Sequence, residues 1–391
     1  MNFNACFFAL SRGVLTLFFV VALAPSARSE SIRYYQRTNL VSDQASVARV
    51  LDPNLHGAWG MARSASSPLW VNSSFSNVSL GYDGDGKPAP SAQPLVVATP
   101  ATPTGIVFNV SNDFAFSATP GQTQLSARYL FASLDGHIAA WNPQIDAGNA
   151  IVMVDNHSSA AYTGLAVARS NDVNKLYAAN FAQARIDVFD AQFHAVPMAA
   201  TAFTDPKISD KFAPFNIQAI NNTLYVTYAR KDVFQRARGR KQGFVDVFDG
   251  NGGLIMQLQR GSWMRAPWGV ALAPPDFGKY GNALLVGQFG SGRIATFNAI
   301  TGRFRGFLTN VNGSPMVITK QGLWGLGFGG GDGSDSGSTS TLYFATDIGG
   351  THGLFGTLTA AEKQVQSTPA PAATPAPSAP TPSPTAQPYP Y

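Results

Sequence analysis

The chain has 391 residues, of which 45% are hydrophobic and only 13% are charged, and its formal net charge is +5. Soluble domains carry roughly 25% charged residues, so this composition favours a sheet protein whose strands are covered on both faces. The single cysteine, Cys6, lies in the first 29 residues, so the rest of the chain can form no disulfide and no cysteine metal site. The small positive charge gives no reason to expect nucleic-acid binding.

Residues 1–29 have the composition of a signal peptide. The apolar run GVLTLFFVVALA (13–24) is too short to span a bilayer, and small residues follow it. We expect cleavage between Ala24 and Ser29, which makes the protein secreted or periplasmic and leaves no transmembrane helix in the mature chain. An uncleaved membrane anchor is the alternative, but no second apolar segment or basic stop follows the run.

Six similar phrases recur along the chain, and each reads as the start of a small antiparallel sheet. They are GAWGMA (57–62), PTGIVFN (103–109), YTGLAVA (162–168), APFNIQAI (213–220), APWGVALAP (266–274) and GLWGLGFG (322–329). A second apolar strand follows each phrase, and a third follows most of them. Short strands rich in Val, Ile, Phe and Tyr and bounded by Gly and Asn are typical of β-meanders.

The spacing of the phrases predicts the architecture. The glycine of the phrase recurs at Gly60, Gly105, Gly164, Gly269 and Gly325, and Asn216 occupies the same position in the one double-length gap. Six units of about 50–55 residues predict an all-β, six-bladed β-propeller over residues 30–360. Two separate domains are the alternative.

Ring closure is also visible in the sequence. The sixth unit ends without an obvious fourth strand, and IRYYQRTNLV (32–41) is a spare strand near the other end of the chain. We therefore expect this segment to complete the sixth blade and close the ring. Residues 361–391, in contrast, are rich in proline, and this composition predicts a disordered tail that acts as a semi-rigid spacer.

Two resemblances follow from these residues. The stretch 266–306, with APWGVAL, LLVGQFGSGRIATFN and GRFRG, resembles the NHL repeat. The chain also resembles an uncharacterised family of exported bacterial NHL-like β-propeller proteins. The stretches that carry this resemblance are NLVSDQ (39–44), WGMA (59–62), FAPFNIQ (212–218), GFVDVFD (243–249), APWGVALAP (266–274) and HGLFG (352–356). Members of that family often end in a PEP-CTERM sorting tail, whereas a proline-rich segment stands in that place here. The resemblance implies an exported propeller and no known reaction.

Four of the five histidines are candidates for a metal site. Loops that lead into an innermost strand and loops between second and third strands share one face of a propeller, which we call the upper face. Its four histidines are His56, His137, His157 and His352, while His194 falls on the lower face. Convergent imidazoles suit zinc, but these residues have no fixed ligand spacing and their turns can be far apart on the ring. We therefore expect no cofactor.

Other motifs have structural interpretations. YDGDGKP (82–88) and GGGDGSDSGSTS (329–340) resemble calcium loops but lack the terminal glutamate, so we interpret them as solvated turns. Trp59, Trp268 and Trp324 share one repeat position, which predicts a structural ring near the axis, with a sugar-stacking platform as the alternative. Four acids at strand ends are expected to cap turns: Asp187, Asp190, Asp246 and Asp249.

The segment RKDVFQRARGRK (230–241) is the most unusual local feature. Its six basic residues are Arg230, Lys231, Arg236, Arg238, Arg240 and Lys241. Such a cluster predicts contact with an anionic partner outside the cytoplasm: an anionic polysaccharide, a lipid head group or an envelope protein. The alternative is a solvated loop.

The sequence leaves two functions open. We expect an exported, monomeric, non-catalytic binding module of unknown ligand. The alternative is a metal-dependent lyase or hydrolase with its site on the loop face around the central axis, which rests on analogy between folds. A purely structural role in an envelope or matrix is a third reading.

Overall fold

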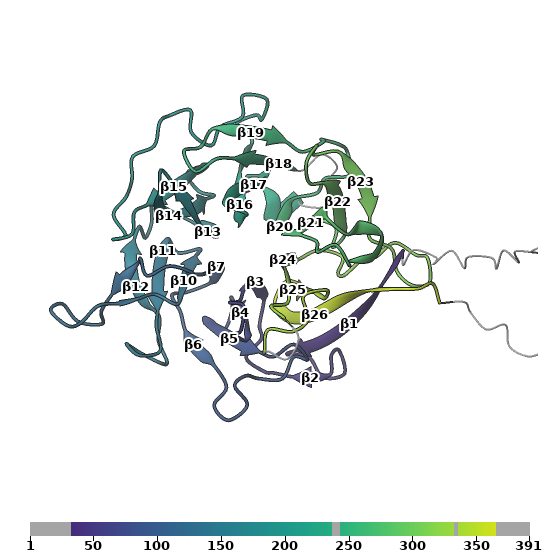
Figure 1. The fold of residues 1–391 in the computed structure, drawn as a ribbon, viewed down its shortest axis with the longest axis horizontal. Coiled ribbons are helices and arrows are strands. Elements are labelled where there is room, and N and C mark those ends of the chain that lie inside the picture. Colours follow the sequence, from purple (N-terminus) through teal and green to yellow (C-terminus); the bar gives the residue numbers. More distant parts are fainter. Residues whose placement is uncertain (1–32, 237–242, 332–334, 365–391) are drawn as a thin grey trace, which may run out of the picture. The chain divides into compact units, whose positions relative to one another are not determined.

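The computed structural model describes residues 33–236, 243–331 and 335–364. The predicted signal peptide and most of the proline-rich tail lie outside these residues. Six small sheets are arranged around one axis, so the predicted six-bladed β-propeller is confirmed (Figure 1). Among the described residues, the helices are too short to serve as membrane spans.

Each blade runs outward from its innermost strand. Blade one contains β3 (Ala58–Ala62), β4 (Leu69–Ser73), β5 (Val78–Tyr82) and β6 (Val96–Ala98); blade two contains β7 (Pro103–Phe108), β10 (Tyr129–Ser133), β11 (His137–Trp141) and β12 (Ile151–Asp155). A short hairpin, β8 (Ala115–Phe116) and β9 (Leu125–Ser126), interrupts blade two after β7. Blade three has three strands, β13 (Tyr162–Ser170), β14 (Val173–Asn180) and β15 (Arg185–Phe189).

The second half of the ring follows the same order. Blade four contains β16 (Phe212–Ile220), β17 (Thr223–Arg230), β18 (Gly243–Phe248) and β19 (Leu254–Gln257), with the short helix α1 (Val233–Arg236) between β17 and β18. Blade five contains β20 (Pro267–Leu272), β21 (Ala283–Gln288), β22 (Ile294–Asn298) and β23 (Phe304–Phe307), with the 3-10 turn η1 (Gly278–Tyr280) between β20 and β21. Blade six contains β24 (Leu323–Phe328), β25 (Leu342–Ile348) and β26 (His352–Ala361).

The ring closes as the sequence predicts. β1 (Tyr34–Ser42) pairs antiparallel with β26, and the two-residue strand β2 (Val50–Leu51) lies outside it (Figure 1). Tyr35 and Val41 of β1 are fully buried, so the closing strand supplies core side chains as well as a hydrogen-bonded ladder. The N-terminal end of the described chain is therefore an integral part of blade six.

The repeated glycines allow the innermost strands to approach one another. A Cβ added to Gly105 would lie 2.6 Å from the backbone nitrogen of Leu165 in the next blade, and additions at Gly60 and Gly269 would overlap the carbonyl oxygens of Thr104 and Trp324. In blade four the same position is Asn216, whose side-chain amide donates to the Trp268 carbonyl at 2.8 Å. A side chain is tolerated there because it forms a bond to the neighbouring blade.

Candidate functional site

Aromatic side chains fill the axis at the upper face. Trp59 stacks on Trp324 with 3.8 Å between ring centroids, and Trp268 meets Trp324 edge-on at 5.9 Å. Phe215 and Phe289 pack on the same tryptophan at 5.7 and 4.3 Å. All five are buried, so the predicted structural ring of tryptophans is confirmed.

The basic segment begins above this cluster. Val233 of α1 is buried, while Phe234 is 46% exposed and its ring lies 6.0 Å from that of Phe289. Arg230 donates two hydrogen bonds to Asp232, at 2.8 and 2.9 Å, so one of the six predicted basic residues is already paired. Lys231 is exposed. Arg236 lies in α1, and the remaining three residues lie outside the described part of the chain: Arg238, Arg240 and Lys241.

Sequence reasoning missed a second group of cations on the same face. Arg265 leads into the innermost strand of blade five, and Arg293 lies between its second and third strands. Burial lowers the pKa of the Arg293 guanidinium, and the positive charge of Arg265 lowers it further. The guanidinium of Arg293 lies over the Phe307 ring, 3.6 Å from its centroid, and its buried Nε has no hydrogen-bond partner in the described chain. The two residues are 28 positions apart, and no motif links them.

Two of the predicted histidines meet at the junction of blades six and one. His56 comes from the loop before β3, and His352 is the first residue of β26. Both Nδ1 atoms approach Oδ2 of Asp43, which directly follows β1, at 2.9 and 2.7 Å. The Asp43 side chain is only 1% exposed, and its Oδ1 accepts the backbone N–H of Gly353 at 2.9 Å. We call these three residues the closure cluster.

The other two histidines meet between blades two and three. His137 begins β11, and His157 lies in the loop before β13; their rings stack with centroids 5.8 Å apart. His137 Nδ1 lies 3.0 Å from Asp135, and His137 Nε2 lies 3.2 Å from Asp155. Asp135, His137 and His157 form the second cluster. Neighbouring blades therefore bring the four histidines together as two separate pairs.

His194 and the acids at strand ends complete this inventory. His194 is exposed, and its Nδ1 lies 3.4 Å from Asp190. Asp190 and Asp249 each accept backbone N–H groups within their own turns, as predicted. Asp246 does not cap a turn: it is fully buried in β18, where burial and the neighbouring carboxylate of Asp205 raise its pKa to about 7. Asp187 of β15 instead accepts hydrogen bonds from the side chains of Tyr162 in β13 and Asn180 in β14.

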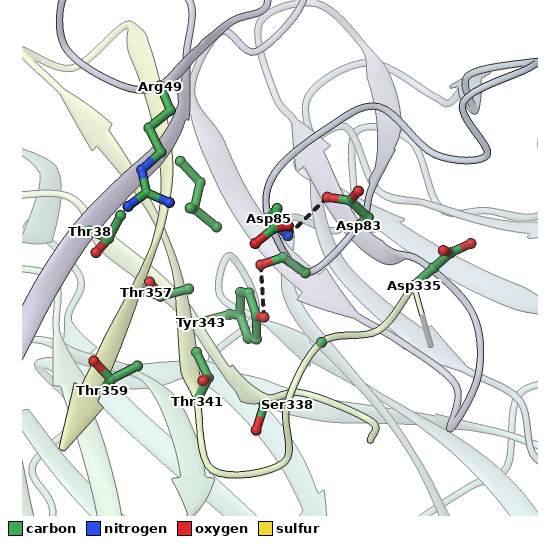
Figure 2. A pocket seen from close by; sticks show the side chains of 13 residues that line it. Thr38, Arg49, Asp83, Asp85, Asp335, Ser338, Thr341, Tyr343, Thr357 and Thr359 are labelled. Atoms are coloured by element: carbon green, nitrogen blue, oxygen red, sulfur yellow. Dashed lines mark hydrogen bonds between the residues drawn. The ribbon is translucent and has the colours of Figure 1, made fainter. Parts of the chain in front are cut away.

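Two cavities lie at the periphery of the ring. One, of about 460 Å³, lies between blade six and blade one and brings together the two aspartate- and glycine-rich loops, with Asp83 and Asp85 from one and Asp335 from the other (Figure 2). Asp83 accepts the backbone N–H groups of Asp85 and Lys87, which supports the interpretation of this loop as a turn. The other, of about 800 Å³, follows the outer edge of β15, where blade three lacks a fourth strand.

Several known proteins are similar to the chain, although no family model matches it. Uncharacterized protein L690 of Acanthamoeba polyphaga mimivirus is 28% identical over 77% of the chain and 81% of its own length. Two solved structures have a similar fold. Virginiamycin B lyase from Staphylococcus aureus is 13% identical over 83% of this chain and 98% of its own, with a TM-score of 0.48. Kuenenia stuttgartiensis hydrazine synthase is 13% identical over 78% of this chain and 77% of its own, with a TM-score of 0.46. Both TM-scores lie below 0.5, so neither likeness carries an inference about function.

A further relative is close enough to identify a family. Uncharacterized protein R648 of the same mimivirus is 30% identical over 314 residues, which span 77% of this chain and 76% of R648. The expected bacterial exported family remains a prediction from the sequence motifs. The chain belongs to the same protein family as R648.

Proposed function

We propose that the protein is a non-catalytic binding module that holds an anionic ligand on its upper face, over blades four and five. The observation that carries this proposal is the pair Arg265 and Arg293. Within the described residues neither guanidinium forms an ion pair. Gln288 links the two positions, because its side-chain oxygen accepts the backbone N–H of Arg265 at 2.9 Å and its own backbone N–H donates to the Arg293 carbonyl at 3.0 Å. The positive charge of Arg265 helps to lower the pKa of Arg293, which indicates repulsion between the two. A carboxylate, sulfate or phosphate group between them would relieve that repulsion and provide acceptors for both forks.

The basic segment adds positive charge to the same face. It joins β17 to β18 in blade four, next to blade five in the ring. Lys231 is exposed, and the segment carries four further basic residues apart from the paired Arg230. An acidic polysaccharide, a lipid head group and an acidic region of an envelope protein all present the anionic groups that this face would recognise. Secretion or periplasmic export, which the N-terminal residues predict, would bring the protein to such ligands.

The filled axis favours binding over catalysis at the centre of the ring. A metal-dependent lyase or hydrolase would need room near the axis for a substrate and a reacting group. Buried tryptophan and phenylalanine side chains occupy the upper end of the axis, and Val233 and Phe234 of α1 lie against them. Recognition by the outer part of the face is compatible with this packing.

Chromatography on a sulfated polysaccharide resin tests the proposal. The double variant Arg265→Gln/Arg293→Gln should elute at lower salt than the parent, because it has two fewer positive charges to bind the resin. Salt screens the remaining charges over a Debye length of about 8–10 Å, so less salt is needed to release the variant. The matched control is Arg169→Gln/Arg303→Gln, which removes the same charge from exposed positions at the lower face. Elution of both double variants at the same salt concentration would refute recognition by Arg265 and Arg293, on which the proposal rests.

A second variant separates the basic segment from the arginine pair. Replacing Lys231, Arg236, Arg238, Arg240 and Lys241 by Gln while keeping Arg230 should also lower the eluting salt concentration. Vesicles containing an anionic lipid, used in place of the resin, distinguish a head group from a polysaccharide. If the variant and the parent eluted together, the segment would be a solvated loop and recognition would rest on Arg265 and Arg293 alone.

A further inference from the structure

We propose that Asp43, His56 and His352 bind one divalent first-row transition-metal ion, of which Zn²⁺ is the reference case, at the junction of blades six and one. The inference is independent of the anionic ligand, because none of these residues belongs to the basic segment or to the arginine pair. It rests on the position, burial and donor chemistry of the closure cluster.

The three donor atoms are already gathered. They lie within 4.8 Å of one another, with Asp43 Oδ2 at 2.9 Å from His56 Nδ1 and at 2.7 Å from His352 Nδ1. Bonds of about 2.0–2.2 Å to a tetrahedral zinc ion would place two ligand atoms roughly 3.3–3.6 Å apart. Each histidine Nδ1 therefore needs to move away from Asp43 Oδ2 by less than about 1 Å to admit the ion.

Neighbouring groups hold the Asp43 carboxylate and the backbone that carries His56. The Gly353 N–H occupies Oδ1 of Asp43, which leaves Oδ2 as the coordinating oxygen. The carbonyl of His56 accepts hydrogen bonds from Ser73 Oγ at 2.9 Å and from the Phe75 N–H at 3.1 Å, so the loop that carries this histidine is fixed. A hydrogen bond to a coordinating carboxylate, such as the one from Gly353 to Asp43, sets the direction of the ligand around a bound metal.

The donor set selects the class of metal. Two imidazole nitrogens and one carboxylate oxygen suit Zn²⁺ and its neighbours in the first transition row, whereas Ca²⁺ and Mg²⁺ prefer oxygen donors alone. The side chains of His56 and His352 are 43% and 42% exposed, so solvent reaches the site from one side. A fourth coordination position would face that solvent and accept water or a small anion.

The position of the site gives the ion a structural consequence. Asp43 belongs to the closing segment after β1, His56 to blade one and His352 to blade six. A bound ion would link the closing segment to both blades beside the place where the ring is joined. Zinc binding should consequently stabilise the folded ring by the free energy of binding.

Calorimetric titration of the chelator-treated full-length chain with Zn²⁺ tests the site. We expect one tight equivalent in the parent, and a dissociation constant more than about 100-fold weaker in His56→Ala and in His352→Ala, since even outer-shell partners are worth 10–100-fold. His194→Ala is the matched control, because His194 has a carboxylate neighbour but belongs to neither metal-ligand cluster. Absence of binding to the parent, or unchanged binding in both cluster variants, would overturn the proposal.

A measurement on the unaltered protein guards against variants that fail to fold. Histidine ring nitrogens labelled with ¹⁵N report metal coordination directly in NMR spectra. We expect the signals of His56 and His352 to change on addition of one equivalent of Zn²⁺ while that of His194 does not. If only other histidines responded, the closure cluster would be a hydrogen-bonded clasp without metal.

Discussion

The closure cluster and the second cluster each contain one aspartate and two histidines, but the closure cluster is centred on a carboxylate and the second cluster on an imidazole. In the closure cluster one buried carboxylate, Asp43, faces two half-exposed imidazoles. In the second cluster the largely buried imidazole of His137 lies between Asp135, whose side chain is 24% exposed, and Asp155, a carboxylate outside the cluster that is 66% exposed. An ion entering either cluster would have to displace contacts between imidazole and carboxylate. In the closure cluster both histidines contact one shared oxygen, whereas the two nitrogens of His137 contact two separate carboxylates. Composition alone therefore does not define a metal site.

The orientation of the rings reinforces this difference. His56 and His352 are tilted by 40° at 6.3 Å, while His137 and His157 are nearly parallel at 28° and 5.8 Å. His137 Nδ1 is buried and has no aligned hydrogen-bond partner in the described chain, although Asp135 lies near it. That nitrogen is the best reason to treat the second cluster as a competing site. The predictions below are designed to separate the two.

Removing the closing strand should have the largest effect. Deletion of residues 32–41 removes the buried side chains of Tyr35, Leu40 and Val41 and leaves the edge of β26 unpaired. At about 1.5–3 kcal/mol for each side chain, the loss is about 5–9 kcal/mol, comparable with the whole stability of a typical domain. Thermal melts and size-exclusion chromatography would measure it. A monomer with the parent melting temperature would mean that the ring is closed in another way.

The stabilisation of the folded protein by zinc should depend on the closure cluster and not on the second cluster. At a free concentration 100 times the dissociation constant, one site adds about 2.7 kcal/mol to the free energy of unfolding. Denaturant titrations with and without Zn²⁺ should show this gain in the parent and in His137→Ala, and should show none in His352→Ala. The opposite pattern would assign the metal to the second cluster.

Two glycines provide a matched steric test. A Cβ at Gly353 would overlap the carbonyl of Leu55, and a Cβ at Gly136, where φ is +86°, would lie 2.7 Å from the carbonyl of Asn156. Each alanine variant should lose roughly 1–3 kcal/mol through overpacking. Only Gly353→Ala should also lose the stabilisation by zinc. The overlap with Leu55 would shift the backbone at residue 353, and its N–H would then no longer hydrogen-bond Asp43 Oδ1. Equal zinc responses in the two variants would argue against the closure site.

The carboxylates should differ even without metal. Asp43→Asn replaces a carboxylate that is 1% exposed and bonded on both oxygens, so we expect a loss of about 1–3 kcal/mol. Asp135→Asn changes a more exposed group and should cost less than about 1 kcal/mol. Urea titrations of chelator-treated protein compare the two. A larger loss at Asp135 would reverse our ranking of the clusters.

Two buried carboxylates outside both clusters are expected to make stability depend on pH. Burial raises the pKa of Asp246 to about 7 and that of Asp347 to about 6, both from 3.8. A raised carboxylate pKa means that the folded state binds more protons, so stability is fully present below about pH 4 and falls as pH rises to about 7. Asp246→Asn should reduce this fall, as stability measured between pH 4 and 8 would show. An unchanged slope would exclude Asp246 as its source.

Much of the fold follows from the sequence because its causes are local and repeated. Each innermost strand needs a residue without a side chain where it meets the next blade, so glycine recurs at a readable interval. Even the exception is visible, since Asn216 occupies the glycine position and bonds across to Trp268. The missing strand of blade three was not predicted, because the segment after β15 has no pattern that marks its loss.

The candidate sites were less predictable because they join segments that are distant in the sequence. The upper-face rule grouped four histidines, but it could not pair His56 with His352, which are 296 positions apart. Asp43 and Asp135 carried no signal of their own until the blades were placed side by side. The same holds for Arg265 and Arg293, whose proximity depends on how the two loops of blade five fold.

A crystal structure of the protein grown with Zn²⁺ tests the central claim most directly, through the position of the anomalous scattering peak at the zinc absorption edge. We predict one strong peak within about 2.0–2.2 Å of His56 Nδ1, His352 Nδ1 and Asp43 Oδ2. A peak between Asp135, His137 and His157 with none at the closure cluster, or no peak at either, would contradict it.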